Sequence, residues 1–344
     1  MTLSVLTGTS STSPRPVPWH RLAWVAWRRY RTTLVATGAL IVVLAGFMLA
    51  RGHQMRDAYA AVKACAPQPS ASCGFAFAQF HDTYANTGPL AALFVWLPAV
   101  IGAFAGAPLL ARELESGTFR YTWTQGAGRT RWMVSLTVSG VLCVAALAAA
   151  FGLLVTWYQQ PLFDSGMQFR LHASVFPVTG VAVIGWAVLA FAIGVFVGLL
   201  TRRVLAAVAL TLAAWTGLGF LAGSVLRDRY AAPLVTSNLQ LSPSDFPVDQ
   251  WWTKGGVRIG DAQLNQVLQA VGVQPIDGGP VQVAPGSSAV DPVQYLIQHG
   301  YTQLTSYQPD SRYWTFQWIE FGWLTLLSVL LLAASIWLLR RRPA

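Results

Sequence analysis

The sequence predicts an all-α integral membrane protein with six transmembrane helices, cytoplasmic termini, an N-terminal interfacial helix and an external domain before the last span. Three observations support this fold class. Only 10% of the 344 residues are charged and 54% are hydrophobic, whereas a soluble domain has about 25% charged residues. Six apolar stretches are long enough to cross a membrane, and the basic residues gather on one side of them.

The six stretches contain no Asp, Glu, Lys or Arg. A helix needs about 17–25 predominantly apolar residues to cross a hydrocarbon core of about 30 Å. They are rich in Leu, Val and Ala without a period of two, so they fit helices and not barrel strands. The predicted spans are Leu34–Ala50, Pro89–Ala111, Trp132–Trp157, Val175–Leu200, Val204–Leu226 and Phe321–Leu339.

The charges predict the orientation. With a cytoplasmic N-terminus, the internal segments hold fourteen arginines and two acids, whereas the longer external segments hold nine basic and eleven acidic residues. Short loops rich in arginine stay in the cytoplasm. The net charge of +10 therefore reflects topology and contact with anionic lipid, and we expect no nucleic-acid partner. The internal arginines are Arg15, Arg21, Arg28, Arg29, Arg31, Arg112, Arg120, Arg129, Arg131, Arg202, Arg203, Arg340, Arg341 and Arg342.

Before the first span, Trp24, Trp27, Arg28 and Arg29 stand close together. Tryptophan with arginine beside a span suits a helix that lies in the headgroup region, although a plain cytoplasmic extension of the span is the alternative. A cleaved signal peptide is disfavoured because roughly 30 residues precede the apolar run. We expect a disordered tail (1–16), the interfacial helix with spans one to five (17–226), an extracellular loop domain (227–320), and the last span with its tail (321–344).

In the loop domain from 227 to 320, the apolar residues of Asp261–Val271 lie on one face of a predicted helix. A second helix is expected near Pro292–His299. In the first external loop, Arg51–Gly88, Cys65 and Cys73 are spaced so that a disulfide is possible. Three pairs of glycines are spaced four residues apart: Gly102 with Gly106, Gly194 with Gly198, and Gly219 with Gly223. Such pairs let helices approach closely, which predicts packing within the chain or, as the alternative, a dimer seam.

The sequence lacks the motifs of several enzyme classes. Neither of its two lysines, Lys63 and Lys254, lies in a glycine-rich phosphate-binding loop. The His-Glu-x-x-His and Gly-x-Ser-x-Gly patterns are also missing, so we expect no enzyme activity, cofactor or metal site. The spans carry no carboxylates for ion coupling. Glu320, beside Trp318 and Trp323, is interpreted as an interfacial anchor.

The cytoplasmic loop after the second span carries Glu113, Glu115, Gly117, Thr118 and Arg120, and Arg129 and Arg131 precede the third span. This sequence pattern resembles that of the type-2 ATP-binding-cassette (ABC) exporter permeases, and the segments 24–31 and 307–317 resemble those of actinobacterial members. The resemblance covers most of the chain. Ser135 stands where members often have lysine, and the loop before the last span is longer than in minimal members.

The resemblance implies a permease subunit in a bacterial cytoplasmic membrane that pairs with itself or a sibling and binds a separate ABC ATPase. The loop acids with Gly117 and Thr118 would form the coupling helix, flanked by Arg120, Arg129 and Arg131. The alternative is that these charges only set the topology. Because the spans are apolar, we expect hydrophobic or amphiphilic cargo. The alternative function is a membrane-anchored sensor or assembly protein whose external domain binds a ligand.

Overall fold

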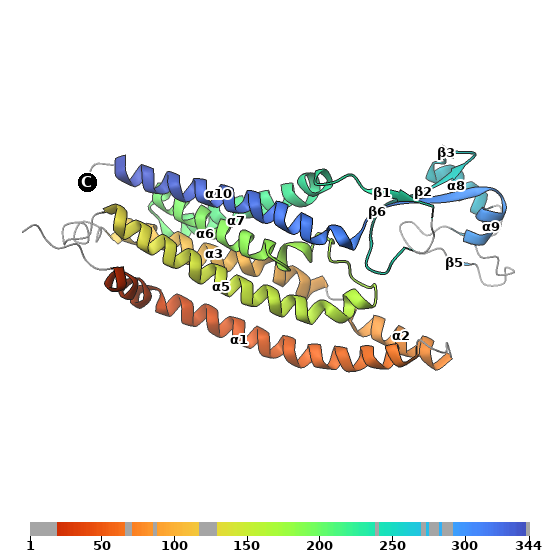
Figure 1. The fold of residues 1–344 in the computed structure, drawn as a ribbon, viewed down its shortest axis with the longest axis horizontal. Coiled ribbons are helices and arrows are strands. Elements are labelled where there is room, and N and C mark those ends of the chain that lie inside the picture. Colours follow the sequence, from red (N-terminus) through yellow and green to blue (C-terminus); the bar gives the residue numbers. More distant parts are fainter. Residues whose placement is uncertain are drawn as a thin grey trace, which may run out of the picture.

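The computed structural model describes residues 19–65, 71–84, 88–116, 129–237, 241–269, 273–274, 282–283 and 292–341. Long helices lie side by side in an elongated bundle (Figure 1). The strands gather beyond one end of this bundle, which we call the sheet end, and helix α10 (Tyr313–Arg341) ends at the opposite end, which we call the C-terminal end (Figure 1).

Six helices of the described residues are long and apolar enough to cross a membrane, which confirms the predicted number of spans. The chain is mostly helical, as predicted. The candidate spans lie within α1 (Trp19–Cys65), α3 (Gly88–Ser116), α5 (Arg129–Asp164), α6 (Ala182–Thr201), α7 (Val204–Leu221) with the π-helix η2 (Ala222–Leu226) and the 3-10 helix η3 (Arg227–Arg229), and η4 (Asp310–Arg312) with α10 (Tyr313–Arg341).

The first span extends farther than predicted. Helix α1 continues to Cys65 and is followed by the shorter helix α2 (Ala71–Tyr84), so much of the expected external loop is helical. Arg56 explains part of this difference. Its guanidinium lies 3.7 Å from the ring centroid of Trp157 and donates a hydrogen bond to the Trp157 carbonyl oxygen. Because α5 satisfies this charge, the helix need not end where the charged residues begin.

The fourth span begins later than predicted. Residues 165–181 form turns and the short 3-10 helix η1 (Phe176–Val178), and α6 begins only at Ala182. Pro177 and Gly180, whose φ is +60°, interrupt a regular helix there. A tight turn joins spans four and five, since α6 ends at Thr201 and Arg202 takes a left-handed conformation with φ of 55° before α7 begins.

Helix α6 lies at the centre of the bundle. Its candidate span is 72% buried within the chain, against 17% for that of α7. The packing of α6 against α3 depends on glycine: a Cβ at Gly102 would lie 2.6 Å from the Cβ of Ala190, and a Cβ at Gly194 would lie 2.7 Å from the nitrogen of Ala107. Gly106 and Gly198 are equally tight. These two glycine pairs therefore pack within the chain, as predicted.

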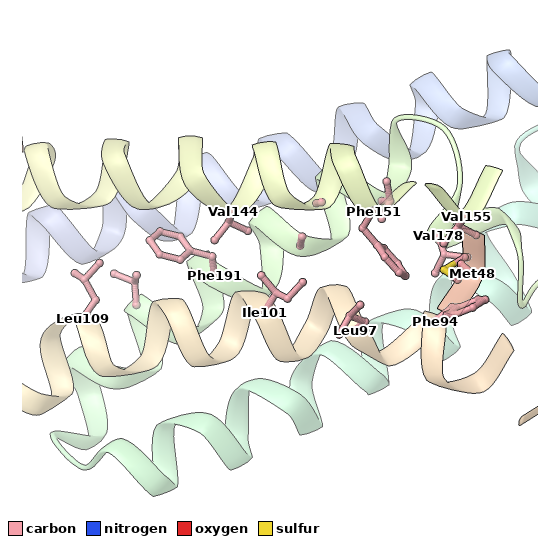
Figure 2. Packing of buried hydrophobic residues seen from close by; sticks show 14 of the residues in the cluster. Met48, Phe94, Leu97, Ile101, Leu109, Val144, Phe151, Val155, Val178 and Phe191 are labelled. Atoms are coloured by element: carbon pink, nitrogen blue, oxygen red, sulfur yellow. The ribbon is translucent and has the colours of Figure 1, made fainter. Parts of the chain in front are cut away.

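The third glycine pair does not pack in this way. A Cβ at Gly219 would meet no atom within 4 Å among the described residues, and one at Gly223 would meet only Nη1 of Arg227 at 4.0 Å. Apolar side chains fill the bundle between α3, α5 and α6 (Figure 2). They include Leu97, Ile101 and Leu109 of α3, Val144, Phe151 and Val155 of α5, and Phe191 of α6.

The segment between α7 and α10 contains strands as well as helices. Helices α8 (Asp261–Gln269) and α9 (Pro292–Gln298) lie where the sequence predicted them. The sheet was not predicted. Its strands run in the order β1-β6-β2-β3, all antiparallel: β1 (Leu234–Thr236), β6 (Tyr301–Gln308), β2 (Phe246–Lys254) and β3 (Val257–Arg258). Strands β4 (Val273–Gln274) and β5 (Gln282–Val283) pair separately. Leu268, Leu296 and Tyr301 form a small core.

Candidate functional site

A buried ion pair lies at the sheet end of the bundle. The Glu320 side chain of α10 is fully buried, and that of Arg227 in η3 is 11% exposed. Arg227 donates from Nε to Oε2 of Glu320 at 2.9 Å and from Nη2 to Oε1 at 2.7 Å. The interpretation of Glu320 as an interfacial anchor is therefore wrong. The exposed tryptophans near it, Trp314 and Trp318, are better suited to that role.

Three aromatic side chains complete the surroundings of the carboxylate. Trp186 of α6 donates from Nε1 to Oε1 of Glu320 at 2.7 Å, and the Tyr230 hydroxyl donates to Oε2 at 3.3 Å. Trp323 in turn donates from Nε1 to the Tyr230 oxygen at 2.8 Å. We call Trp186, Arg227, Tyr230, Glu320 and Trp323 the Glu320 cluster. A buried charge is tolerated when it is paired and hydrogen-bonded, and Glu320 accepts four hydrogen bonds here.

The Glu320 cluster joins three helical segments that are far apart in the sequence. Arg227 follows α7, Glu320 lies on the buried face of α10, and Trp186 belongs to the central helix α6. The whole β-containing segment leaves the bundle after Tyr230 and returns before Tyr313. The cluster therefore closes the base of that segment and ties it to the core of the bundle.

A second set of polar contacts fixes the start of α6 against α10. The Gln317 side chain, fully buried, accepts a hydrogen bond from the Ala182 nitrogen at 2.7 Å and donates from Nε2 to the Phe176 carbonyl oxygen at 3.0 Å. The Tyr313 hydroxyl donates to Oγ1 of Thr179 at 3.0 Å. These bonds satisfy backbone groups that a helix start leaves without partners, so α6 and α10 are held together at the sheet end.

The surroundings of Tyr230 change its acidity. Burial, followed by the negative charge of Glu320, raises the pKa of Tyr230 to about 12. A buried phenol next to a carboxylate keeps its proton because ionisation would place two negative charges in a poorly solvated site. Tyr230 therefore acts as a hydrogen-bond donor to Glu320 and as an acceptor from Trp323.

At the C-terminal end, Glu115 has a contact that the sequence did not predict. The backbone nitrogen of Val204, at the start of α7, donates to Oε2 of Glu115 at 3.3 Å. A carboxylate at a helix N-terminus satisfies a free N–H and complements the helix dipole. Glu115 thereby links the end of α3 to the start of α7, while Arg340 of α10 donates to Oγ1 of Thr130 at 3.2 Å.

Several predicted site residues lie outside the described part of the chain. Gly117, Thr118 and Arg120 are outside the described residues, and so are the side chains of Glu113, Arg129, Trp27, Arg28 and Arg29. Trp24 lies in the first turns of α1 and has 59% of its surface exposed. The predicted interfacial segment and the first span belong to this one helix. Arg131 is half-buried near the start of α5.

The cysteines are described in part. Cys73 is disulfide-bonded and Cys143 is free. The side chain of Cys65 is outside the described residues, so its pairing with Cys73 stays a prediction. Over the described ranges, no group of three or more His, Cys, Asp or Glu side chains is arranged to hold a metal ion.

Comparison with known families decides how this helical bundle is classified. A family model described as "ABC-2 membrane transporter related" matches residues 38–227. The chain belongs to this family. No curated protein and no solved structure matches it. Members of the ABC-2 type are membrane subunits of transporters and are not themselves catalytic, and they generally work with an ABC ATPase subunit.

The ABC-2-related region covers five of the six candidate spans and ends at Arg227. Its partner Glu320, and the β-containing segment between the two residues, lie beyond the matched region. The Glu320 cluster therefore joins the family region of this ABC-2 transporter chain to a part that the family model does not describe.

Proposed function

We propose that this chain is the permease subunit of an ATP-driven ABC exporter of the actinobacterial type, in a bacterial cytoplasmic membrane. The observation that carries the proposal is the family match over residues 38–227, which contains the loop after the second span. Two copies of the chain, or this chain and a sibling, would enclose the path, and a separate ATPase would supply the energy. Its cargo would be hydrophobic or amphiphilic, because the spans are apolar.

The distribution of arginines supports a cytoplasmic C-terminal end. Contacts bring the end of α3, the turn between α6 and α7, the start of α5 and the end of α10 to this end of the bundle. Arg112, Arg202, Arg203, Arg340 and Arg341 lie on these segments. Because short arginine-rich loops stay inside, the β-containing segment at the opposite end would lie outside the cell.

The packing of α3 suggests how the ATPase would act on the spans. Of the proposed coupling segment, Glu113 and Glu115 lie in the last turn of α3, which continues beyond the predicted span, and Gly117, Thr118 and Arg120 follow in the sequence. Arg129 and Arg131 begin α5. Close glycine contacts hold α3 against α6, so these two helices would move together. Glu115 also touches the start of α7. A push on the loop would therefore be passed to α3, α6 and α7 at once.

The proposal is tested by purifying the tagged chain in detergent and identifying the proteins that accompany it by mass spectrometry. We expect an ABC ATPase subunit with the wild type and its loss with the double variant Glu113→Ala/Glu115→Ala. Because Glu115 also caps α7, the single variant Glu115→Gln, which keeps an acceptor oxygen, separates a lost cap from a lost docking contact.

The matched control is the double variant Arg258→Ala/Asp249→Ala, which removes an exposed ion pair at the opposite end of the molecule and should retain the ATPase. All variants must elute as the wild type does in gel filtration. A well-folded wild type that captures no ATPase would contradict the exporter and favour the sensor.

A further inference from the structure

Two hollows meet at Arg227. The first, about 370 Å³, lies between α3, α6 and α7, and we call it the membrane hollow. Four aromatic side chains line it: Trp96, Trp186, Trp215 and Phe220. The second, about 380 Å³, lies beneath the sheet, and we call it the sheet hollow. Both are lined by Ala173, Gly223 and Arg227, and their volumes lie in the range of small-molecule sites, about 300–1,000 Å³.

The membrane hollow is open toward the face of α7 that the bundle does not cover. Phe220 is 77% exposed and Trp96 is 41% exposed, although both line the hollow. The inner wall consists of aromatic side chains in mutual contact: the rings of Trp96 and Trp215 lie 5.7 Å apart, and Trp215 donates from Nε1 to the Trp186 carbonyl oxygen at 3.2 Å. An apolar chain in the surrounding lipid can therefore enter this hollow sideways between aromatic walls.

Arg227 presents a hydrogen-bonding group at the junction. Its bonds to Glu320 use Nε and Nη2, and in the described part of the chain no hydrogen bond occupies Nη1. This nitrogen lies 4.0 Å from the position that a Cβ would take at Gly223, which lines both hollows. The absence of a side chain at Gly223 thus keeps the space in front of the two N–H groups of Nη1 open.

The local charges indicate what kind of group fits there. Glu320 already neutralises Arg227, and the acid Asp228 lines the sheet hollow next to it. A full anion at Nη1 would gain little net attraction from a paired guanidinium and would face that second carboxylate. An uncharged oxygen acceptor, such as an ester carbonyl or a hydroxyl, gains the hydrogen bonds without this repulsion.

We propose that the membrane hollow binds the apolar chain of a single-chain amphiphile whose uncharged, oxygen-bearing headgroup accepts hydrogen bonds from Nη1 of Arg227. The sheet hollow continues past the headgroup toward the β-containing segment. This inference rests on the proposed transport function in that the bound amphiphile is cargo on its way out, and it narrows the cargo to this chemical class.

The test uses a monoacylglycerol that carries a photoreactive diazirine on its acyl chain, with the full-length protein in phosphatidylcholine nanodiscs. After illumination, mass spectrometry locates and quantifies the label. We expect saturable labelling of the segments that contain Trp96 and Phe220, with competition by unlabelled monoacylglycerol. The fatty acid of the same chain length, an anion, should compete at least about tenfold more weakly.

The decisive variant is Gly223→Leu. A Cβ at this position meets nothing closer than 4.0 Å, so the variant should fold while its side chain fills the junction of the hollows and weakens binding about tenfold or more. Gly217→Leu is the matched control, because Gly217 lies in α7, which continues into the π-helix η2 that holds Gly223, has open space around it and lines neither hollow. The control should bind as the wild type does.

Three results would overturn the inference: labelling that does not saturate and is spread over all lipid-facing helices, equal binding by the two leucine variants, or stronger competition by the fatty acid than by the monoacylglycerol. Capture of the ATPase, measured with the wild type and with the Gly223→Leu protein, distinguishes this inference from the proposed exporter function. For the wild type, captured ATPase without saturable labelling refutes this inference alone, whereas saturable labelling without any captured ATPase refutes the proposed function.

Discussion

Replacing Arg227 by methionine should destabilise the bundle strongly, because the buried Glu320 carboxylate would lose its counter-charge. The lost contacts are two charge-assisted hydrogen bonds of 2.9 and 2.7 Å, each worth about 1.5–3 kcal/mol. Breaking a buried ion pair by removing one partner costs about 3–5 kcal/mol. We therefore expect Arg227→Met to lower the free energy of unfolding by about 3–5 kcal/mol, measured by equilibrium unfolding in mixed micelles and followed by tryptophan fluorescence.

A double-mutant cycle separates the charge from the shape of the site. Arg227→Met/Glu320→Gln removes both charges but keeps an acceptor oxygen for Trp186, so it should recover about 1–3 kcal/mol of the loss in the single variant. The matched control is Arg258→Met, whose partner Asp249 is 52% exposed at 3.3 Å and which should cost less than about 1 kcal/mol. An Arg227→Met variant as stable as this control would refute the reasoning.

Three further outcomes are expected. Gly194→Ala should destabilise the chain by about 1–3 kcal/mol because its Cβ would overlap α3, while Gly46→Ala, with nothing within 4 Å, should change unfolding little; equal effects would contradict the α3–α6 packing. Tyr230, with its pKa raised to about 12, should stabilise the fold fully below its ordinary pKa of 10.0 and lose this contribution as the pH rises toward 12. The tyrosinate absorbance, compared with Tyr230→Phe, checks this, and ionisation near pH 10 would refute it. Alkylation without reductant should modify one thiol, and after reduction three; more than one beforehand would exclude the Cys65–Cys73 bond.

The number of spans and much of their extent could be predicted from the sequence because lipid leaves few alternatives to an uninterrupted apolar helix. The tight turn at Arg202 followed from two apolar runs separated by three residues. Helix α8 was predictable because its apolar residues repeat with a helical period. In each case a local pattern was sufficient to predict the element.

The Glu320 cluster could not be predicted in this way, because Arg227 and Glu320 are separated by the whole β-containing segment. Glu320 stands among exposed tryptophans in the sequence, and only the packing of α10 on α6 turns it inward. Sheet strands were equally hard to foresee. Strand β2 pairs with β6 across a separation of some 50 residues, and both strands mix polar and aromatic residues without a clean alternation.

The capping role of Glu115 was missed for the same reason, since its partner is the backbone of Val204 on another helix. One signal was available. The turn between α6 and α7 offers no Ser, Thr, Asn or Asp directly before the first residue of α7, so its free N–H groups need an acceptor from elsewhere.

ATP-dependent transport in reconstituted vesicles tests most directly whether this chain is the membrane subunit of an exporter. The chain and the ATPase that co-purifies with it are placed in liposomes with the nucleotide-binding side outward, and uptake of a radiolabelled monoacylglycerol is followed with ATP or with a non-hydrolysable analogue. Uptake that requires hydrolysis, and that is abolished by Glu113→Ala/Glu115→Ala, is the predicted result. Uptake of the probe that is the same with either nucleotide, in vesicles whose ATPase activity also does not depend on this chain, would contradict the exporter.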